Sequence, residues 1–409
     1  MLILLCFVVF IIRLFWLFYF KRSYHIGFLV PFFLEIIFVY PYLFMDTLGL
    51  YWSYLGFILN YTIVTVVQIG AACNIMLPKK DVLFITAKHS YKLLTTLIIL
   101  SFIGVISNLP NQVLFPSNID SLFALSHSNA VARYDGTLKV SAIYKVSSIF
   151  AYFTTFLMGM MYATSRTKKI LLFILLHFGV ILIDSVVMAA RAGMMLQLFC
   201  FLASFYAFSY YNSSRENYRV TFKKILLSLI FVLVIFLFFV TIQVVRGGKT
   251  EYDITGIVSH VVTWFVGYIP GFDYWINNLY DYDITYGQRT FVGLFDILGI
   301  SERVSGVYPA IDIGNGRISN IFTAYRGLIE DFSMLGLYVA LIIVGILLSC
   351  IPNIVVARQA KFLAPITSFI VFFFFWSYVI NPFSYNVILF AALMFWVYFI
   401  IFVRMKSCD

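Results

Sequence analysis

Arginine is the residue type in this sequence whose placement most suggests chemistry. Arginines recur in segments that lie between apolar runs, accompanied there by Lys139, Lys145 and Lys249. The guanidinium group binds phosphate or carboxylate through two parallel hydrogen bonds, which lysine cannot do. The pattern predicts an anionic ligand, with pairing to aspartates of the same segments as the alternative for any single arginine. The arginines concerned are Arg133, Arg191, Arg246, Arg289, Arg303, Arg317 and Arg326.

The run 317–336 combines cations, carboxylates and hydrogen-bonding side chains just before a late apolar stretch. If it is helical, Thr323, Arg326 and Glu330 share one face through three- and four-residue spacing. Asn320 adds a further polar group near the start of the run. We expect a substrate-binding face here; the alternative is an interfacial anchor with a local Arg326–Glu330 pair.

A polar stripe precedes one of the other arginines. His177, Asp184 and Arg191 recur every seven residues and so fall on roughly one face of a helix. Polar side chains inside an apolar run usually mark a functional path or a buried pair. The stripe predicts a polar cavity, and a structural Asp184 partnered inside the bundle is the alternative.

Two shorter motifs are weaker. Arg246-Gly247-Gly248-Lys249-Thr250 could let backbone N–H groups approach an anion, although a flexible loop explains it equally well. Asp281-Tyr282-Asp283 could hold a divalent metal, but no histidine or third carboxylate flanks it. We therefore expect no metal and no other cofactor.

The elements that must position these residues are membrane helices. The chain is 62% hydrophobic and 11% charged, whereas soluble domains carry about 25% charged residues. Apolar runs near the length needed to cross a bilayer recur throughout. We expect residues 1–409 to form a single all-α polytopic membrane domain with about eleven transmembrane helices. The expected spans are 2–20, 26–44, 53–76, 92–109, 144–164, 170–189, 193–211, 225–245, 333–351, 363–381 and 385–403.

Basic clusters predict the orientation of these spans. Lysine and arginine follow every second span, as at Lys79-Lys80, Lys168-Lys169 and Arg404. By the positive-inside rule that side is cytoplasmic, so the C-terminus is inside and the N-terminus outside. The basic clusters that orient the chain in the membrane then explain the net charge of +10. We therefore expect no nucleic-acid partner.

Two long segments remain on the outer side, approximately 110–143 and 246–332. Segments of this length are usually functional or disordered, and the aromatic content of the second argues against disorder. We expect short interfacial helices within it, near Ile257–Tyr268 and Phe291–Ile300.

Several short patches resemble bacterial O-antigen polymerases of the Wzy type, which polymerise oligosaccharide repeat units. Glycine is expected after Asp331-Phe332, where this chain has Ser333. The patches are Asn320-Ile321-Phe322-Thr323, Asp331-Phe332-Ser333-Met334-Leu335-Gly336, Ala190-Arg191-Ala192-Gly193, Asn129 with Arg133-Tyr134-Asp135-Gly136, and Gly287-Gln288-Arg289-Thr290 with Leu298-Gly299.

The resemblance implies a metal-independent glycosyltransferase in the bacterial inner membrane. It would transfer a growing glycan from undecaprenyl pyrophosphate to a hydroxyl of the next lipid-linked repeat unit, at the periplasmic face. Arg191 and Arg326 would bind the pyrophosphate. The resemblance favours Asp331 as the base, ahead of Glu330 and His260. A chain-length regulator protein would be a further partner, besides the lipid bilayer.

Two alternatives remain. An O-antigen ligase would use a different acceptor and an essential outer histidine, for which His127 and His260 are the candidates. A transporter or flippase for lipid-linked sugars would show internal repeats and helix breaks at mid-membrane, and neither is visible in the sequence.

Overall fold

The membrane helices account for most of the computed structural model. It describes residues 8, 11–12, 26–73, 83–87, 91–108, 119–134, 137–188, 190–212, 237, 240–242, 244, 254–280, 283–300 and 308–407. Six helical segments are long and apolar enough to cross a bilayer. They are Leu29–Leu48, α4 (Tyr54–Ala72), α7 (Ala142–Thr164), α8 (Lys168–Val187), α9 (Arg191–Asn212) and α14 (Ala324–Arg358).

Shorter helices complete the bundle. The segment Leu29–Leu48 consists of most of α2 (Ile26–Phe38) with η1 (Tyr40–Phe44) and α3 (Met45–Leu48). The shorter apolar helices are α5 (Tyr91–Ser107), α15 (Ala364–Trp376), which follows η2 (Lys361–Leu363), and α16 (Asn386–Phe402), which follows η3 (Pro382–Ser384).

Nine of the expected spans thus coincide with helices. The expected spans 2–20 and 225–245 lie almost entirely outside the described residues. The structure confirms an α-helical multi-pass membrane protein, and the count of about eleven stays a prediction.

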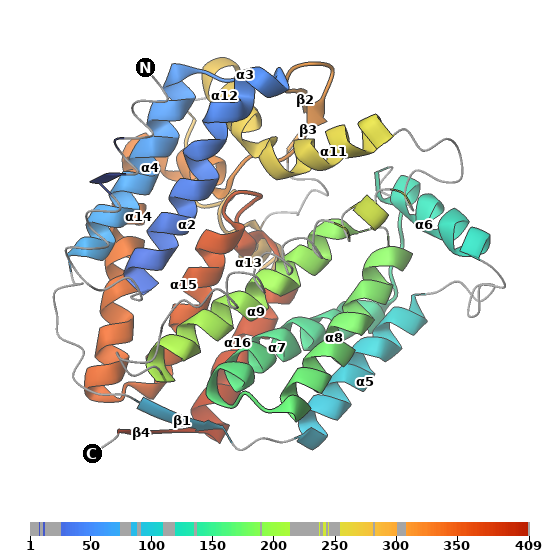
Figure 1. The fold of residues 1–409 in the computed structure, drawn as a ribbon, viewed down its shortest axis with the longest axis vertical. Coiled ribbons are helices and arrows are strands. Elements are labelled where there is room, and N and C mark those ends of the chain that lie inside the picture. The colour runs from blue at the N-terminus through green and yellow to red at the C-terminus, as the bar shows by residue number, and fades with distance from the viewer. Residues whose placement is uncertain are drawn as a thin grey trace.

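The helices that join the spans gather at one end of the bundle. Figure 1 shows α6 (Ile119–Tyr134), α11 (Ile254–Val266) and α12 (Tyr268–Asn278) at the end opposite the C-terminal strand. The hairpin of β2 (Ile311–Asp312) and β3 (Ile318–Ser319) lies at the same end. The two segments expected on the outer side therefore share one end of the molecule, called the outer end below.

The other end carries a feature that the all-α expectation missed. β1 (Leu83–Ala87) pairs antiparallel with β4 (Val403–Ser407), from Leu83 opposite Ser407 to Ala87 opposite Val403. The two strands satisfy each other's backbone groups in this ribbon. β1 contains no charged residue, whereas β4 contains Arg404 and Lys406, and nothing in either strand alone indicates its partner.

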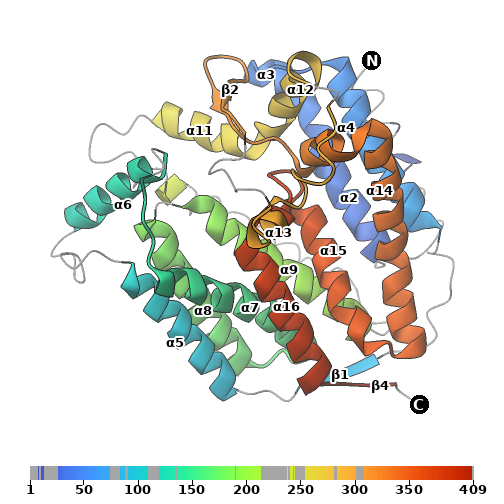
Figure 2. The ribbon, with the colours of Figure 1, turned by 180° about the vertical axis from the view of Figure 1, so that it is seen from behind.

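Helices are present, with shifted bounds, in the regions where interfacial helices are expected. α11 and α12 occupy the region expected near Ile257–Tyr268, and α13 (Val292–Ile297) lies within Phe291–Ile300. Figure 2 shows α13 at the outer end of α16, where Asn386 Nδ2 donates to Asp296 Oδ2 at 2.6 Å. The outer segment is thus packed onto the bundle.

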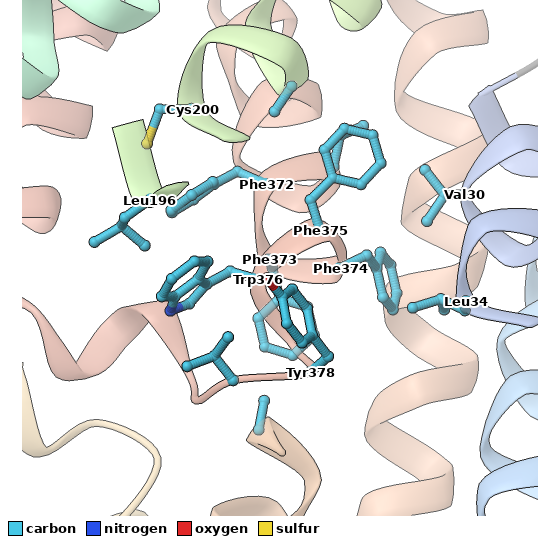
Figure 3. Close-up of a cluster of buried hydrophobic side chains, with 14 of the residues drawn as sticks. Val30, Leu34, Leu196, Cys200, Phe372, Phe373, Phe374, Phe375, Trp376 and Tyr378 are labelled. Atoms are coloured by element: carbon cyan, nitrogen blue, oxygen red, sulfur yellow. The ribbon is translucent and has the colours of Figure 1, made fainter. Parts of the chain in front are cut away.

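An aromatic core on α15 joins α2 to α9. Phe372, Phe374 and Trp376 are almost fully buried. In Figure 3, Phe374 points toward Val30 and Leu34 of α2, and Phe372 lies beside Leu196 and Cys200 of α9. Lipid is as apolar as these rings, so removal of the rings from water does not favour helix association here. The close packing of the rings holds the helices together instead.

Small residues allow a second close contact, between α4 and α14. A Cβ added at Gly70 would lie 2.5 Å from the carbonyl oxygen of Ile342, and one added at Gly345 would lie 2.6 Å from that of Val67. Glycine at both positions therefore lets the two backbones touch. This contact fixes α14, the helix that carries the candidate site.

Candidate anion-binding site

The first turns of α14 form a short helix at the outer end. Its first backbone N–H, at Ala324, donates to the carbonyl oxygen of Ser377 at 2.6 Å. The helix is interrupted at Ser333, where φ is 64° and ψ is 176°. This backbone region is nearly exclusive to glycine. The conformation explains why glycine is expected at this position.

Arg326 lies buried on this short helix. Its Nε donates to Glu330 Oε1 at 2.8 Å, so the local pair named as part of the alternative for this run is present. Its guanidinium carbon lies 3.8 Å from the ring centre of Tyr308, 4.5 Å from that of Phe322 and 5.1 Å from that of Trp275. Three rings thus restrict the guanidinium and stabilise its charge. Its Nη1 is buried without a hydrogen-bond partner among the described residues.

Glu330 lies between two guanidinium groups. Its Oε2 is 3.8 Å from Nε of Arg289, whose side chain is 51% exposed against 15% for Glu330. Burial raises the pKa of the nearby Tyr308 phenol, and the charge of Glu330 adds to that effect. Tyr308 therefore stays protonated and neutral beside the ion pair.

Asp331 binds a loop rather than an arginine side chain. Its carboxylate accepts hydrogen bonds from Thr285 Oγ1 at 2.5 Å, Arg289 N at 3.0 Å and Thr290 N at 2.5 Å. Asn381 Nδ2 donates to the carbonyl oxygen of Thr290 at 2.9 Å from the other side. Two patches far apart in the sequence, at 287–290 and 331–336, are therefore in contact.

Three side-chain oxygens near Arg326 also lack a hydrogen bond. Thr323 Oγ1, Thr290 Oγ1 and Glu330 Oε2 are buried without a hydrogen-bond partner among the described residues. Buried polar groups are normally satisfied, so a group of such atoms indicates a place for a polar ligand. Donors and acceptors are both present among these atoms.

Arg191 belongs to a second group. Its Nη2 lies 3.0 Å from Nε2 of His260 on α11, and Arg191 is 5% exposed. The guanidinium donates, so the imidazole accepts through a neutral Nε2. The structure thus brings together a predicted phosphate ligand and a predicted base that are 69 residues apart.

The remaining predicted residues are more scattered. Arg317 lies partly buried on β2–β3 and Asn320 is exposed. Thr323 precedes α14 rather than sharing its helical face. Arg246 and the side chain of Arg133 lie outside the described residues, as do Asp281 and Tyr282, whereas Asp283 is described and exposed. In the described ranges no group of three His, Cys, Asp or Glu residues could hold a metal.

The aromatic rings around Arg326 were missed by the sequence reasoning. Trp275, Tyr308 and Phe322 come from three separate stretches with no common spacing. The only signal was the unusual aromatic content of the outer segment.

Fold and site together define a class: a helical multi-pass membrane protein with clustered arginines at one end of the bundle. No protein-family model matches the chain, and comparisons with curated proteins and with solved structures likewise find no match.

Proposed function

We propose that this protein is a metal-independent glycosyltransferase that polymerises undecaprenyl-pyrophosphate-linked repeat units into O-antigen polysaccharide. The outer end would face the periplasm, with the N-terminus there and the C-terminus in the cytoplasm. One observation carries the proposal: Arg326 and Arg289 flank Glu330 at the outer end of a membrane helix. Such an end meets the headgroups of lipid-linked substrates.

The arrangement suits displacement of a pyrophosphate. An acceptor hydroxyl oxygen would attack the anomeric carbon of the donor, and the bond from that carbon to the phosphate oxygen would break. Negative charge then grows on the leaving pyrophosphate, where fixed guanidinium groups stabilise it. Before substrate binds, Glu330 is the anionic partner of Arg326 and Arg289. A pyrophosphate would take its place as the anion that these guanidinium groups bind.

That replacement gives Glu330 a second role. A carboxylate that loses its cationic partners becomes a better proton acceptor. Asp331, the base favoured by the resemblance, has both oxygens occupied by the 285–290 loop. We therefore propose Glu330 as the base and Asp331 as the residue that positions Arg289.

A ligase is the second candidate, and one contact favours it. A ligase would need an outer histidine, and His260 lies 3.0 Å from Arg191, so an imidazole and a guanidinium could act on one substrate. This reaction differs from polymerisation only in the acceptor.

The lipopolysaccharide of a deletion strain separates the candidates. Loss of a polymerase should leave lipid A core bearing a single repeat unit, and the plasmid-borne gene should restore the ladder. Bare core would identify a ligase or a flippase instead. A normal ladder would refute all three.

A further inference from the structure

A cavity of about 250 Å³ lies inside the bundle, apart from the Arg326 site. At about 30 Å³ per water molecule it has room for roughly eight waters, or for one sugar ring. Residues of α5, α7, α8, α9 and α16, and of the turns before α9 and α16, line it. The polar ones are Ser101, Tyr144, Ser147, Ser148, Tyr152, Asp184, Gln197 and Tyr385.

The lining favours a neutral, hydroxyl-rich ligand. None of the described residues that line the cavity is an arginine, lysine or histidine, and Asp184 is its acidic residue. A phosphate would meet a carboxylate there without a cation. Hydroxyl, amide and carboxylate groups instead offer donors and acceptors to sugar hydroxyls.

The polar groups are held in place by neighbours. Tyr144 Oη donates to Asp184 Oδ2 at 3.1 Å. The hydroxyl of Thr155 lies 2.9 Å from both Gln197 Oε1 and His177 Nε2. The expected stripe is thus divided: Asp184 lines the cavity, whereas His177 lies behind Gln197.

The second arginine is next to the cavity lining in the chain. Ala190 and Ala192 line the cavity, and Arg191 stands between them in the chain. Its lining reaches Tyr152, ten residues into α7, or about 15 Å below the outer end of that helix at 1.5 Å per residue. A ligand could therefore place a phosphate at Arg191 and a neutral group below it.

From this geometry we infer that the cavity binds one sugar residue of the lipid-linked glycan, with Asp184 accepting its hydroxyls. The inference rests on the proposed function and adds a glycan subsite to it.

Two glycines supply a matched pair of variants. A Cβ added at Gly193, which lines the cavity, would meet no atom within 4 Å, and the same holds at Gly179 on α8, which does not line it. Gly193→Ala adds a Cβ without a packing clash, and Gly193→Leu should fill more of the cavity. Gly179→Leu makes the same chemical change outside it.

The experiment measures binding to purified protein in nanodiscs. Its probes are the lipid-linked repeat unit extracted from the deletion strain and sugar-free undecaprenyl pyrophosphate. Gly193→Leu should weaken binding of the sugar-bearing lipid at least tenfold, with Gly193→Ala intermediate, and leave the sugar-free lipid unaffected. Asp184→Asn should act in the same direction. Gly179→Leu should bind both probes as wild type does.

Equal weakening for both probes would mean that the cavity takes the lipid or its phosphates, and the inference would fail. Unchanged binding of the sugar-bearing lipid in Gly193→Leu would also overturn it. All proteins in this experiment carry Glu330→Gln, which removes the proposed base, so that the sugar-bearing lipid is bound without turnover. The binding outcomes are therefore independent of the ladder, and failure of the proposed function is seen separately.

Discussion

The guanidinium of Arg326 is fixed by one carboxylate and three aromatic rings, while its Nη1 is left without a hydrogen bond among the described residues. A group held this way need not reorganise when charge develops beside it, which is the main source of electrostatic catalysis. Lysine could supply the charge at this position, but not the planar group that fits between the rings.

Arg326→Lys should therefore lower the rate of polymerisation by about 10²- to 10³-fold at normal protein abundance. Arg358→Lys, at the other end of the same helix, is the control and should polymerise normally. The measurement is chain length in complemented deletion cells. Long chains in Arg326→Lys cells would remove this residue from the mechanism.

Ser333 allows a test of backbone strain. Its φ of 64° with ψ of 176° costs a residue with a Cβ about 1–3 kcal/mol. Ser333→Gly should raise the free energy of unfolding by about 1 kcal/mol, after allowing for the greater freedom of glycine in the unfolded chain. Ser333→Ala keeps the Cβ and should give no gain. Thermal unfolding in detergent checks both; equal behaviour of the two variants would argue against strain at this kink.

At the scale of elements, Asp273 joins the outer helix α12 to the start of α4. Its Oδ1 accepts from Tyr42 Oη and its Oδ2 from the backbone N–H of Ser53, each at 2.8 Å. Gly56 makes room, since a Cβ there would overlap the carboxylate. Through α12 this joint also supports Trp275, one of the rings on Arg326.

The joint should depend on pH. Burial raises the pKa of Asp273 to about 7 from an ordinary 3.8, although hydrogen bonds from Ser53 and Tyr42 oppose the rise. Between these values the folded protein holds a proton that the unfolded chain releases, so the free energy of unfolding falls as pH rises from 3.8 to about 7. Asp273→Asn should lose this part of the pH dependence.

Thermal unfolding of both proteins at about pH 5 and about pH 7.5 makes the comparison. Wild type should lose more stability than Asp273→Asn on going to the higher pH. An equal loss in the two proteins would mean that Asp273 is ionised at both pH values, which would contradict its raised pKa.

The sequence predicted the membrane helices well because each is a long apolar run with its own signal. α14 shows the limit: the expected span 333–351 is the middle of a helix that extends from Ala324 to Arg358, with a kink at Ser333. A hydropathy profile detects only the apolar part of α14. The β1–β4 pair was missed because strand pairing depends on segments more than 300 residues apart.

The contacts of the candidate site were predicted only where the residues are close together in the sequence. Arg326 and Glu330 are four residues apart, so helical spacing alone indicated their contact. The contacts of Arg289 with Glu330 and of Arg191 with His260 depend on how the outer segment folds back on the bundle. No local pattern encodes that path, and the same holds for the rings around Arg326.

For the whole molecule, the proposal requires the outer end to face the periplasm. Reporter fusions at Asp283 and Ser117 should therefore read periplasmic, and those at Lys169 and Lys406 cytoplasmic, as the basic clusters predict. Lys169 lies at the start of α8 and Asp283 between α12 and α13, and the two form the internal control. A cytoplasmic signal at Asp283 would place the arginines in the wrong compartment for the reaction.

The most direct test of the central claim is polymerisation by the purified protein. The reconstituted protein would be given the lipid-linked repeat unit from the deletion strain, with a chelator and without nucleotide, and its products separated by length. Wild type should form chains of several repeat units, and protein carrying both Arg191→Lys and Arg326→Lys should leave the substrate unchanged. Failure of correctly folded wild type to extend the substrate, or equal chain growth by the double variant, would contradict the account.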